Sequence, residues 1–319
     1  MSVDVYTFQD PGAPQLTGTA GSLITVLDAT LVVSGWTKSF SAANKAVYRP
    51  PSGNQFYLRV DDTGLDAPVG GSARVTAYEN MTTVDAGTGP FPSAAQGASS
   101  AGHVLWHKNM TAAGAGGAWR IIVTPTFVWF WVRAQTSSTT GTGFVLCCFG
   151  DVPSKKSGDA FNTIVLGNIA ATFAGNYINT GIEAVISTVT PAAAGGMFIA
   201  RQQDQTGTSQ AIRFVPFESD KMAVTSVGKL SNATVFTAPH IPDGKLFFST
   251  LEIAEKPAAS SYWRATLPGL YSLVGMGNAF FTDDAEFTIG GKTLLAARVS
   301  TTSATWVDGW VLFEVSNTW

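Results

Sequence analysis

The run VWFWV, residues 128–132, carries the clearest indication of the fold. Side chains of a strand alternate between its two faces, so Trp129 and Trp131 lie on one face and Val128, Phe130 and Val132 on the other. Both faces are apolar, and such a strand must be covered on both sides. A sandwich core covers one face, and the second is covered by another layer of the same chain or by a partner subunit. A sugar-binding aromatic platform is the alternative.

Short apolar or alternating runs separated by Gly, Pro, Ser and Thr continue along the chain. In residues 55–60, Phe56, Leu58 and Val60 recur at every second position, which is the pattern of a half-buried strand. Other strand-like runs are residues 73–78, 119–123, 127–132, 143–149, 163–166, 197–200, 211–215, 245–253, 292–299 and 306–315. This spacing predicts a mainly β fold, with antiparallel β-sandwich or barrel domains.

One short helix is expected near the N-terminus, in SLITVLDATLVV, residues 22–33. Leu23, Ile24, Leu27 and Leu31 share one helical face, and Ser22 is the candidate N-cap. A buried strand through residues 31–33 is the alternative.

The chain has 319 residues, enough for one large or two ordinary domains. We expect a β-rich N-terminal domain in residues 1–150, with the helix, and a β-rich C-terminal domain in residues 151–319. Turn residues around Lys155 and Lys156 place the boundary near residues 150–158. Stretches rich in Gly, Ala, Ser and Thr at residues 85–102 and 136–143 are expected to be surface loops.

Two blocks resemble each other, residues 36–60 and 106–132. Each has a Trp (Trp36, Trp106), a Lys two residues later, an Ala-Ala pair, an aromatic-Arg dipeptide and an apolar strand. Two hairpins of similar shape, each covered by its Trp, would explain the likeness. Chance similarity is the alternative. With Trp129 and Trp131, these two tryptophans are the candidate core or interface residues.

Only 13% of the residues are charged, and 19 Lys and Arg against 22 Asp and Glu give a net charge of -3. No basic excess exists to neutralise phosphates, so nucleic acid is not expected as a partner. No run reaches the roughly 18 apolar residues of a membrane span, and no membrane partner is expected. The first residues lack the basic and apolar regions of a secretory signal, so synthesis and folding in a cytoplasm are expected.

Cys147 and Cys148 are adjacent, so in a strand they point to opposite faces and cannot easily bridge each other. We expect two reduced cysteines, at least one of them in a core. His103, His107 and His240 are not spaced with them as a zinc site requires, and neither a metal nor a cofactor is expected.

The sequence contains no nucleophile elbow, zinc-protease pair or phosphate-binding loop, so no enzymatic activity is expected. Paired acids remain as candidates for glycoside hydrolysis: Asp61 with Asp62, and Asp283 with Asp284 and Glu286. Both groups lie in turns, where acids commonly cap the backbone. Capping is therefore the preferred interpretation, with a calcium site as a further alternative.

Ordered short motifs along most of the chain resemble a family of tailed-bacteriophage virion proteins encoded among structural genes. They are DPGAPQLTGTAGSLITVLDATLV (residues 10–32), GWTKSFSAANKAVYR (35–49), FYLRVDDTG (56–64), ARVTAYENM (73–81), TGPFP (88–92), WRI (119–121), FGDVPSKKSGDAFN (149–162) and WRATLPGLYSLVGMGNAFFTDD (263–284). The resemblance implies a component of the particle and carries over no active site.

The resemblance therefore implies a structural virion protein, made in the host cytoplasm and assembled in multiple copies on the tail, neck or head surface. Its expected partners are copies of itself and the tail tube, connector or capsid protein. A low-charge, aromatic-rich chain suits such assembly, because it buries apolar surface between subunits without desolvating ions. A host-surface glycan-binding module of the tail is the first alternative, and a capsid decoration protein or a glycan-degrading enzyme is the second.

Overall fold

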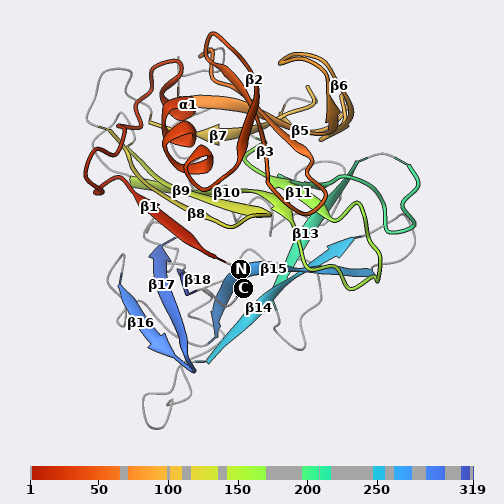
Figure 1. The fold of residues 1–319 in the computed structure, drawn as a ribbon. Helices are drawn as coiled ribbons and strands as arrows, with labels where there is room; N and C mark the ends of the chain where they lie inside the picture. Colours follow the sequence, from red (N-terminus) through yellow and green to blue (C-terminus); the bar gives the residue numbers. More distant parts are fainter. Residues whose placement is uncertain are drawn as a thin grey trace.

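The computed structural model describes residues 2–64, 71–98, 101–109, 116–135, 142–169, 196–207, 209–216, 247–255, 262–274, 285–298, 310–316 and 319. The fold is mainly β, with antiparallel sheets and one short helix near the N-terminus, as the sequence predicted (Figure 1). Its layered sheets are consistent with a β-sandwich.

Two sheets contain all the named strands. The 12-stranded sheet has the order β1 (Asp4–Thr7), β8 (Ala118–Val123), β9 (Phe127–Gln135), β10 (Thr142–Asp151), β11 (Thr163–Leu166), β12 (Met197–Ile199), β13 (Gln210–Pro216), β14 (Phe247–Glu255), β15 (Tyr262–Val274), β18 (Trp310–Glu314), β17 (Lys292–Arg298) and β16 (Glu286–Ile289). The six-stranded sheet has β2 (Thr37–Ala42), β3 (Lys45–Arg49), β4 (Tyr57–Asp61), β5 (Ser72–Met81) and β6 (Gly87–Phe91) in order, and β7 (Val104–His107) pairs with β5.

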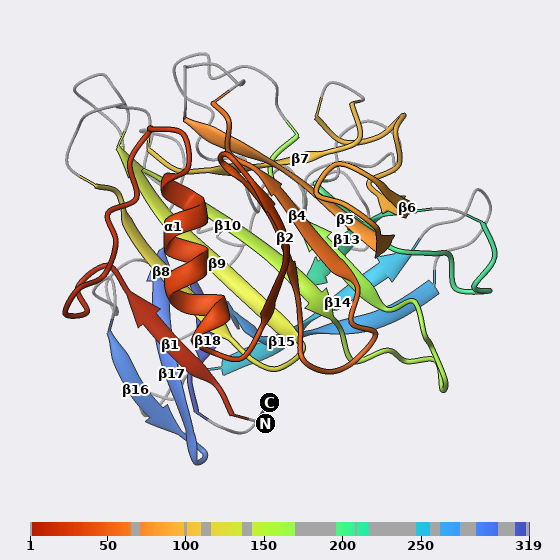
Figure 2. The same ribbon diagram turned by 45° about the horizontal axis from the view of Figure 1, so that its top comes forward.

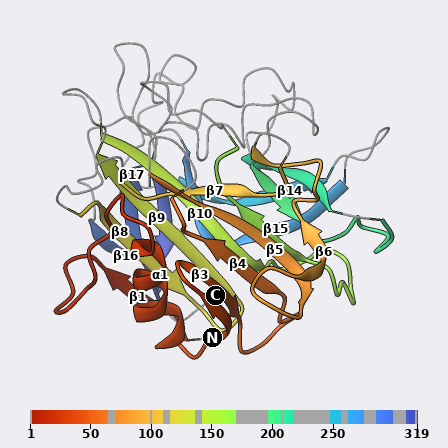
Figure 3. The same cartoon turned by 90° about the horizontal axis from the view of Figure 1, so that it is seen from above.

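The long sheet curls, so that its two halves face each other across a core. Figure 1 shows β8, β9 and β10 between the six-stranded sheet above and strands β14 to β18 below. Figure 2 and the view from above in Figure 3 place the helix and the six-stranded sheet over β8, β9 and β10. The molecule therefore has three layers, and the middle layer is covered on both faces.

Each face of the middle layer lies in a different hydrophobic core. Val128, Phe130 and Val132 of β9 belong to the core under the six-stranded sheet and the helix. Trp129 and Trp131 belong to the core enclosed by the curl of the long sheet. The strand is thus covered twice, as its sequence required, and both covers come from the same chain.

The expected helix is present as α1 (Ser22–Leu27), which continues as a π-helical turn, η1 (Asp28–Val32). Its predicted apolar face is buried in the first core. The prediction of Ser22 as N-cap is wrong: Gly21 holds that position with φ of 82°, and glycine has no side chain with which to cap the helix. The backbone N–H of Leu23 instead donates to Asp62 Oδ2 at 2.9 Å, so a distant residue caps the helix.

Most predicted strands are confirmed with small shifts at their ends. The loop expected at residues 85–102 is wrong in part, because β6 (Gly87–Phe91) pairs there with β5. Of the loop expected at residues 136–143, residues 142 and 143 belong to β10 and the rest lie outside the described residues. Besides β6, strands β1, β2, β3, β7, β15 and β16 were not expected. Strands β1 and β7 have only four residues each.

The two similar blocks do not form two equivalent hairpins. Residues 36–60 contain β2, β3 and β4, which are consecutive neighbours in the six-stranded sheet. Residues 106–132 begin in β7 of that sheet and continue in β8 and β9 of the other. The expected boundary near residues 150–158 falls between β10 and β11, which are paired strands of one sheet. The division into two domains stays a prediction.

Candidate functional site

All four tryptophans singled out in the sequence are buried. Trp36, Trp106, Trp129 and Trp131 are 2% exposed or less. The indole N–H of Trp36 donates to Thr124 O at 3.0 Å, that of Trp106 to Leu166 O at 2.9 Å and that of Trp129 to Pro268 O at 2.9 Å.

Each of these three bonds joins a tryptophan to a distant segment of the long sheet. Buried indole N–H groups need such acceptors, so the bonds set the spacing of the layers as well as filling the cores. The structure therefore places these residues in the cores of a single chain.

The two cysteines divide between the cores as the alternation predicted. Cys147 lies in the first core and Cys148 in the second, and both are free. Complete burial raises the pKa of each thiol well above its ordinary value. Both therefore behave as small apolar side chains in the folded protein.

His107 lies in a buried hydrogen-bond chain rather than on a helix. Its Nδ1 is 2.6 Å from Ser72 Oγ, and its Nε2 is 2.8 Å from Asn168 Nδ2. An amide nitrogen only donates, so Nε2 is the acceptor and Nδ1 carries the hydrogen that Ser72 accepts. This tautomer does not take a proton from Ser72. His103 lies just before β7, and His240 falls outside the described residues.

No group of three or more His, Cys, Asp or Glu residues in the described chain could hold a metal ion. Among the candidate acids, Asp61 and Asp62 follow one another at the end of β4 but face different partners. Burial opposes the ionisation of Asp61, yet Thr63, Arg59 and Lys45 together lower its pKa. Asp62 pairs with the buried Lys108. Glu286 is an exposed residue of β16, and Asp283 and Asp284 lie outside the described residues.

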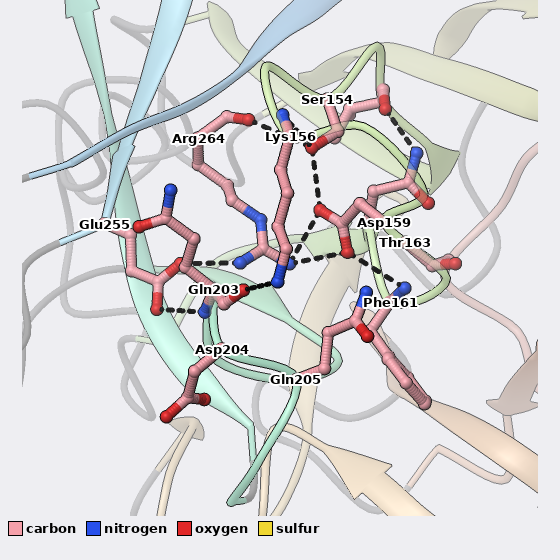
Figure 4. A network of polar contacts seen from close by, with 12 residues as sticks. Ser154, Lys156, Asp159, Phe161, Thr163, Gln203, Asp204, Gln205, Glu255 and Arg264 are labelled. Atoms are coloured by element: carbon pink, nitrogen blue, oxygen red, sulfur yellow. Dashed lines mark hydrogen bonds and ion pairs between the residues drawn. The ribbon is translucent and has the colours of Figure 1, made fainter.

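A polar cluster that the sequence did not single out centres on Arg264 of β15 (Figure 4). A β-bulge places this side chain: Ile253 pairs with Ala265 and Ala254 with Trp263, so Arg264 is the extra residue between them. Bulges re-aim side chains in this way. The Arg264 side chain is fully buried.

Arg264 binds two buried carboxylates from different parts of the chain. Its Nη1 donates to Glu255 Oε2 at 3.0 Å, and its Nη2 lies 2.9 Å from Asp159 Oδ2. Both carboxylate side chains are 1% exposed. Burial raises the pKa of Glu255 even though Arg264 and the Gln203 N–H stabilise its anion.

Three connections of the long sheet meet at this cluster, which we call the Arg264 network. The β10–β11 connection supplies Asp159 and Ser154, whose hydroxyl donates to Asp159 Oδ2 at 2.7 Å. The β12–β13 connection supplies Gln203, whose backbone N–H donates to Glu255 Oε1 at 2.9 Å. The same residue's carbonyl accepts from Lys156 Nζ. Glu255 is the last residue of β14, and Arg264 lies near the beginning of β15.

A neighbouring contact joins the six-stranded sheet to the same region. Arg201 donates to both carboxylate oxygens of Glu79 in β5, at 2.6 and 2.5 Å. Its guanidinium also lies over the ring of Phe161, 4.0 Å from the centroid. A two-pronged ion pair with a stacked ring is a geometry that arginine alone supplies. The β10–β11 and β12–β13 connections are therefore fixed to both sheets.

The β10–β11 connection also lines an open depression of about 470 Å³, with Ser154, Lys156, Gly158, Asp159, Ala160 and Asn162 at its surface. The Ser154 hydroxyl donates to Asp159 and accepts from the Lys156 backbone N–H at 3.1 Å. Asp159 is bound to Arg264. These groups hold one another in place, so the arrangement is suited to shaping a surface rather than to proton transfer.

Comparison with protein-family models and with curated proteins found no match for this chain. Within the described residues, no helix is long and apolar enough to cross a membrane.

Proposed function

We propose that this chain is a structural, non-enzymatic component of a tailed-phage virion, present in multiple copies on the tail, neck or head surface. Its partners are copies of itself and a tail tube, connector or capsid protein. In this proposal, the protein is synthesised in the host cytoplasm and is then incorporated into the particle.

The observation that supports this proposal is a contact between two of the motifs that resemble the virion family. Residues 149–162 and 263–284 both resemble the virion family, and they are about a hundred residues apart in the sequence. Asp159 of the first motif and Arg264 of the second form a buried ion pair. In this proposal, the two motifs hold a rigid scaffold together, as a structural component of a particle requires.

The outer surface offers features that suit assembly. The terminal strands of the long sheet, β1 and β16, each have one strand neighbour in the described chain. Such edges pair readily with another chain. Phe8, Val33 and Trp263 are large apolar residues with 38%, 69% and 42% of their surface exposed. These edges and residues are where we place contacts between subunits.

Mass spectrometry of purified particles, combined with immunogold electron microscopy using an antibody against this chain, tests the proposal. We expect the chain in the particle, with label at one position on the tail, neck or head. A chain that is missing from the particle inventory and gives no label on intact particles would refute the virion assignment.

A glycan-binding module is the second candidate, and the open depression beside the Arg264 network favours it. Hydroxyl, amide and charged groups at its surface are the kinds of group that orient a sugar. The assembled protein is tested for binding to host cells and to purified surface polysaccharide. Binding that Asn162→Ala weakens would support this candidate, and no binding by the correctly assembled protein would eliminate it.

A further inference from the structure

The six-stranded sheet contains a buried lysine and a buried aspartate at the ends of two strands that flank a third. Asp62 directly follows β4, and Lys108 directly follows β7. Strands β4 and β7 both pair with β5, close to its first residues. The two side chains therefore meet across the beginning of β5.

We propose that Lys108 and Asp62 join covalently after folding, through an amide bond between Lys108 Nζ and Asp62 Cγ, with the loss of one water molecule. The reaction needs no cofactor and no oxidant. Its product is a cross-link between β4 and β7 that spans β5.

The geometry holds the two groups in contact. Both side chains are 0% exposed, and Lys108 Nζ donates to Asp62 Oδ1. Their backbones are fixed as well, because Lys108 N–H donates to Gly71 O at 2.8 Å and Asp62 N–H to Asn44 O at 2.8 Å. Groups held together in this way react with effective concentrations of roughly 10⁵ to 10⁸ M in favourable cases.

Burial also favours the reactive protonation states. It raises the pKa of Asp62 and lowers the pKa of Lys108, in each case against the attraction of the partner. Both shifts favour the uncharged pair, a carboxylic acid beside an amine with a free lone pair. An unprotonated amine is the nucleophile that attacks a carboxyl carbon.

The surrounding groups match the amide better than the ion pair. The described residues offer Nζ two acceptors, Asp62 Oδ1 and Thr19 O, the latter at 2.7 Å, whereas an ammonium carries three hydrogens. An amide nitrogen has one hydrogen, which Thr19 O accepts. The amide oxygen is Oδ2, which already accepts the N–H of Leu23 at 2.9 Å.

The chemical step follows from these contacts. The Nζ lone pair attacks Cγ, and the negative charge that develops on Oδ2 is stabilised by the Leu23 N–H. The bond from Cγ to Oδ1 then breaks, and Oδ1 leaves as water with two of the three hydrogens of the original ammonium. The third hydrogen stays on the amide nitrogen, so atoms and charge balance.

The intact mass of the purified, denatured full-length protein tests the proposal. We expect it to lie one water molecule below the mass of the sequence, and we expect trypsin not to cleave after Lys108. Tryptic peptide 60–74 should then be joined to peptide 75–120, which contains the uncleaved Lys108. The test uses the unaltered protein, so its outcome does not depend on whether a variant folds.

Two variants serve as a matched pair. Lys108→Met should restore the full mass of its own sequence, whereas Lys38→Met, which removes a partly exposed lysine paired with Asp28, should keep the water deficit. A full mass for the unaltered protein, with normal cleavage after Lys108, would overturn the proposal. A water deficit with normal cleavage after Lys108 would overturn it too, because the dehydration would then lie elsewhere.

Discussion

Replacing Arg264 by methionine should destabilise the protein strongly, because it leaves two carboxylates buried without their cation. Methionine keeps much of the apolar volume of the arginine stem and removes the guanidinium that binds Glu255 and Asp159. Removing one partner of a buried ion pair costs about 3 to 5 kcal/mol of the free energy of unfolding. At about 2 °C of Tm per kcal/mol for a chain of this size, Tm should fall by about 6 to 10 °C.

The loss should also depend on pH, and its sign follows from proton binding. Burial raises the pKa of Glu255 above its ordinary value of 4.5. Between the unfolded and folded pKa values, the native state holds more protons than the unfolded chain, so stability falls as pH rises through that window. Without Arg264 the folded pKa rises further, and the window extends upward. The variant should therefore lose more stability at pH 8 than at pH 5.

Urea unfolding of the unaltered protein and of Arg264→Met at the two pH values measures both effects. The double variant Glu255→Gln with Arg264→Met is the control, since it removes one of the stranded charges. It should be more stable than Arg264→Met at pH 8, although it differs at one more position. A loss below about 1 kcal/mol, or an equal loss at both pH values, would refute the assignment of a buried charge network.

Three further predictions concern the cores and the backbone. Trp131→Ala should lower the free energy of unfolding, measured by urea titration, by about 3 to 5 kcal/mol and should reduce incorporation into particles. Trp263→Ala, at a residue that is 42% exposed, should lower the free energy of unfolding far less. Equal losses for the two variants would contradict the burial of Trp131. Cys147 and Cys148 should resist alkylation by iodoacetamide at pH 8 until urea unfolds the protein, because burial raises the pKa of both thiols. Rapid labelling of the native protein would contradict the burial of these thiols. Gly150→Ala should lower Tm, since φ at Gly150 is 140° and a Cβ there would collide with the backbone of Thr126 and Phe127. An unchanged Tm would contradict this close approach between β10 and the start of β9.

The apolar layers could be predicted from sequence because their signals are local. The alternation in residues 128–132 determines which side chains share a face, whatever covers them. The same alternation separates Cys147 from Cys148, and the spacing of Leu23, Ile24, Leu27 and Leu31 fixes one face of the helix. The sequence left open only whether the second cover of β9 came from this chain, and the curl of the long sheet supplies it.

The polar contacts could not be predicted because each joins residues that are distant in the chain. Ser22 has the residue type of an N-cap, yet Asp62 takes that role from the end of β4. The sequence predicted no strand at Arg264, and only the pairing of β14 with β15 shows that it is the extra residue of a bulge. A strand register is set by partners, so no pattern within β15 alone could reveal it. Residues 149–162 and 263–284 contain Asp159 and Arg264, but their pairing is visible only in the fold.

The few charged residues of this chain are used in a way that explains how distant segments find one registered arrangement. Apolar layers of similar shape can slide or exchange partners at little cost, because their contacts are not directional. A buried polar or charged group allows no such exchange, since leaving it unpaired costs about 2 kcal/mol or more. Lys108 Nζ donates to Thr19 O and Asp62 accepts the N–H of Leu23, so these two residues fix the six-stranded sheet to the start of the helix. Arg264 with Asp159 and Glu255 fixes the β10–β11 connection to β14 and β15. Removing either cluster should therefore first change which segments pair with each other. The amount of buried apolar surface should change less.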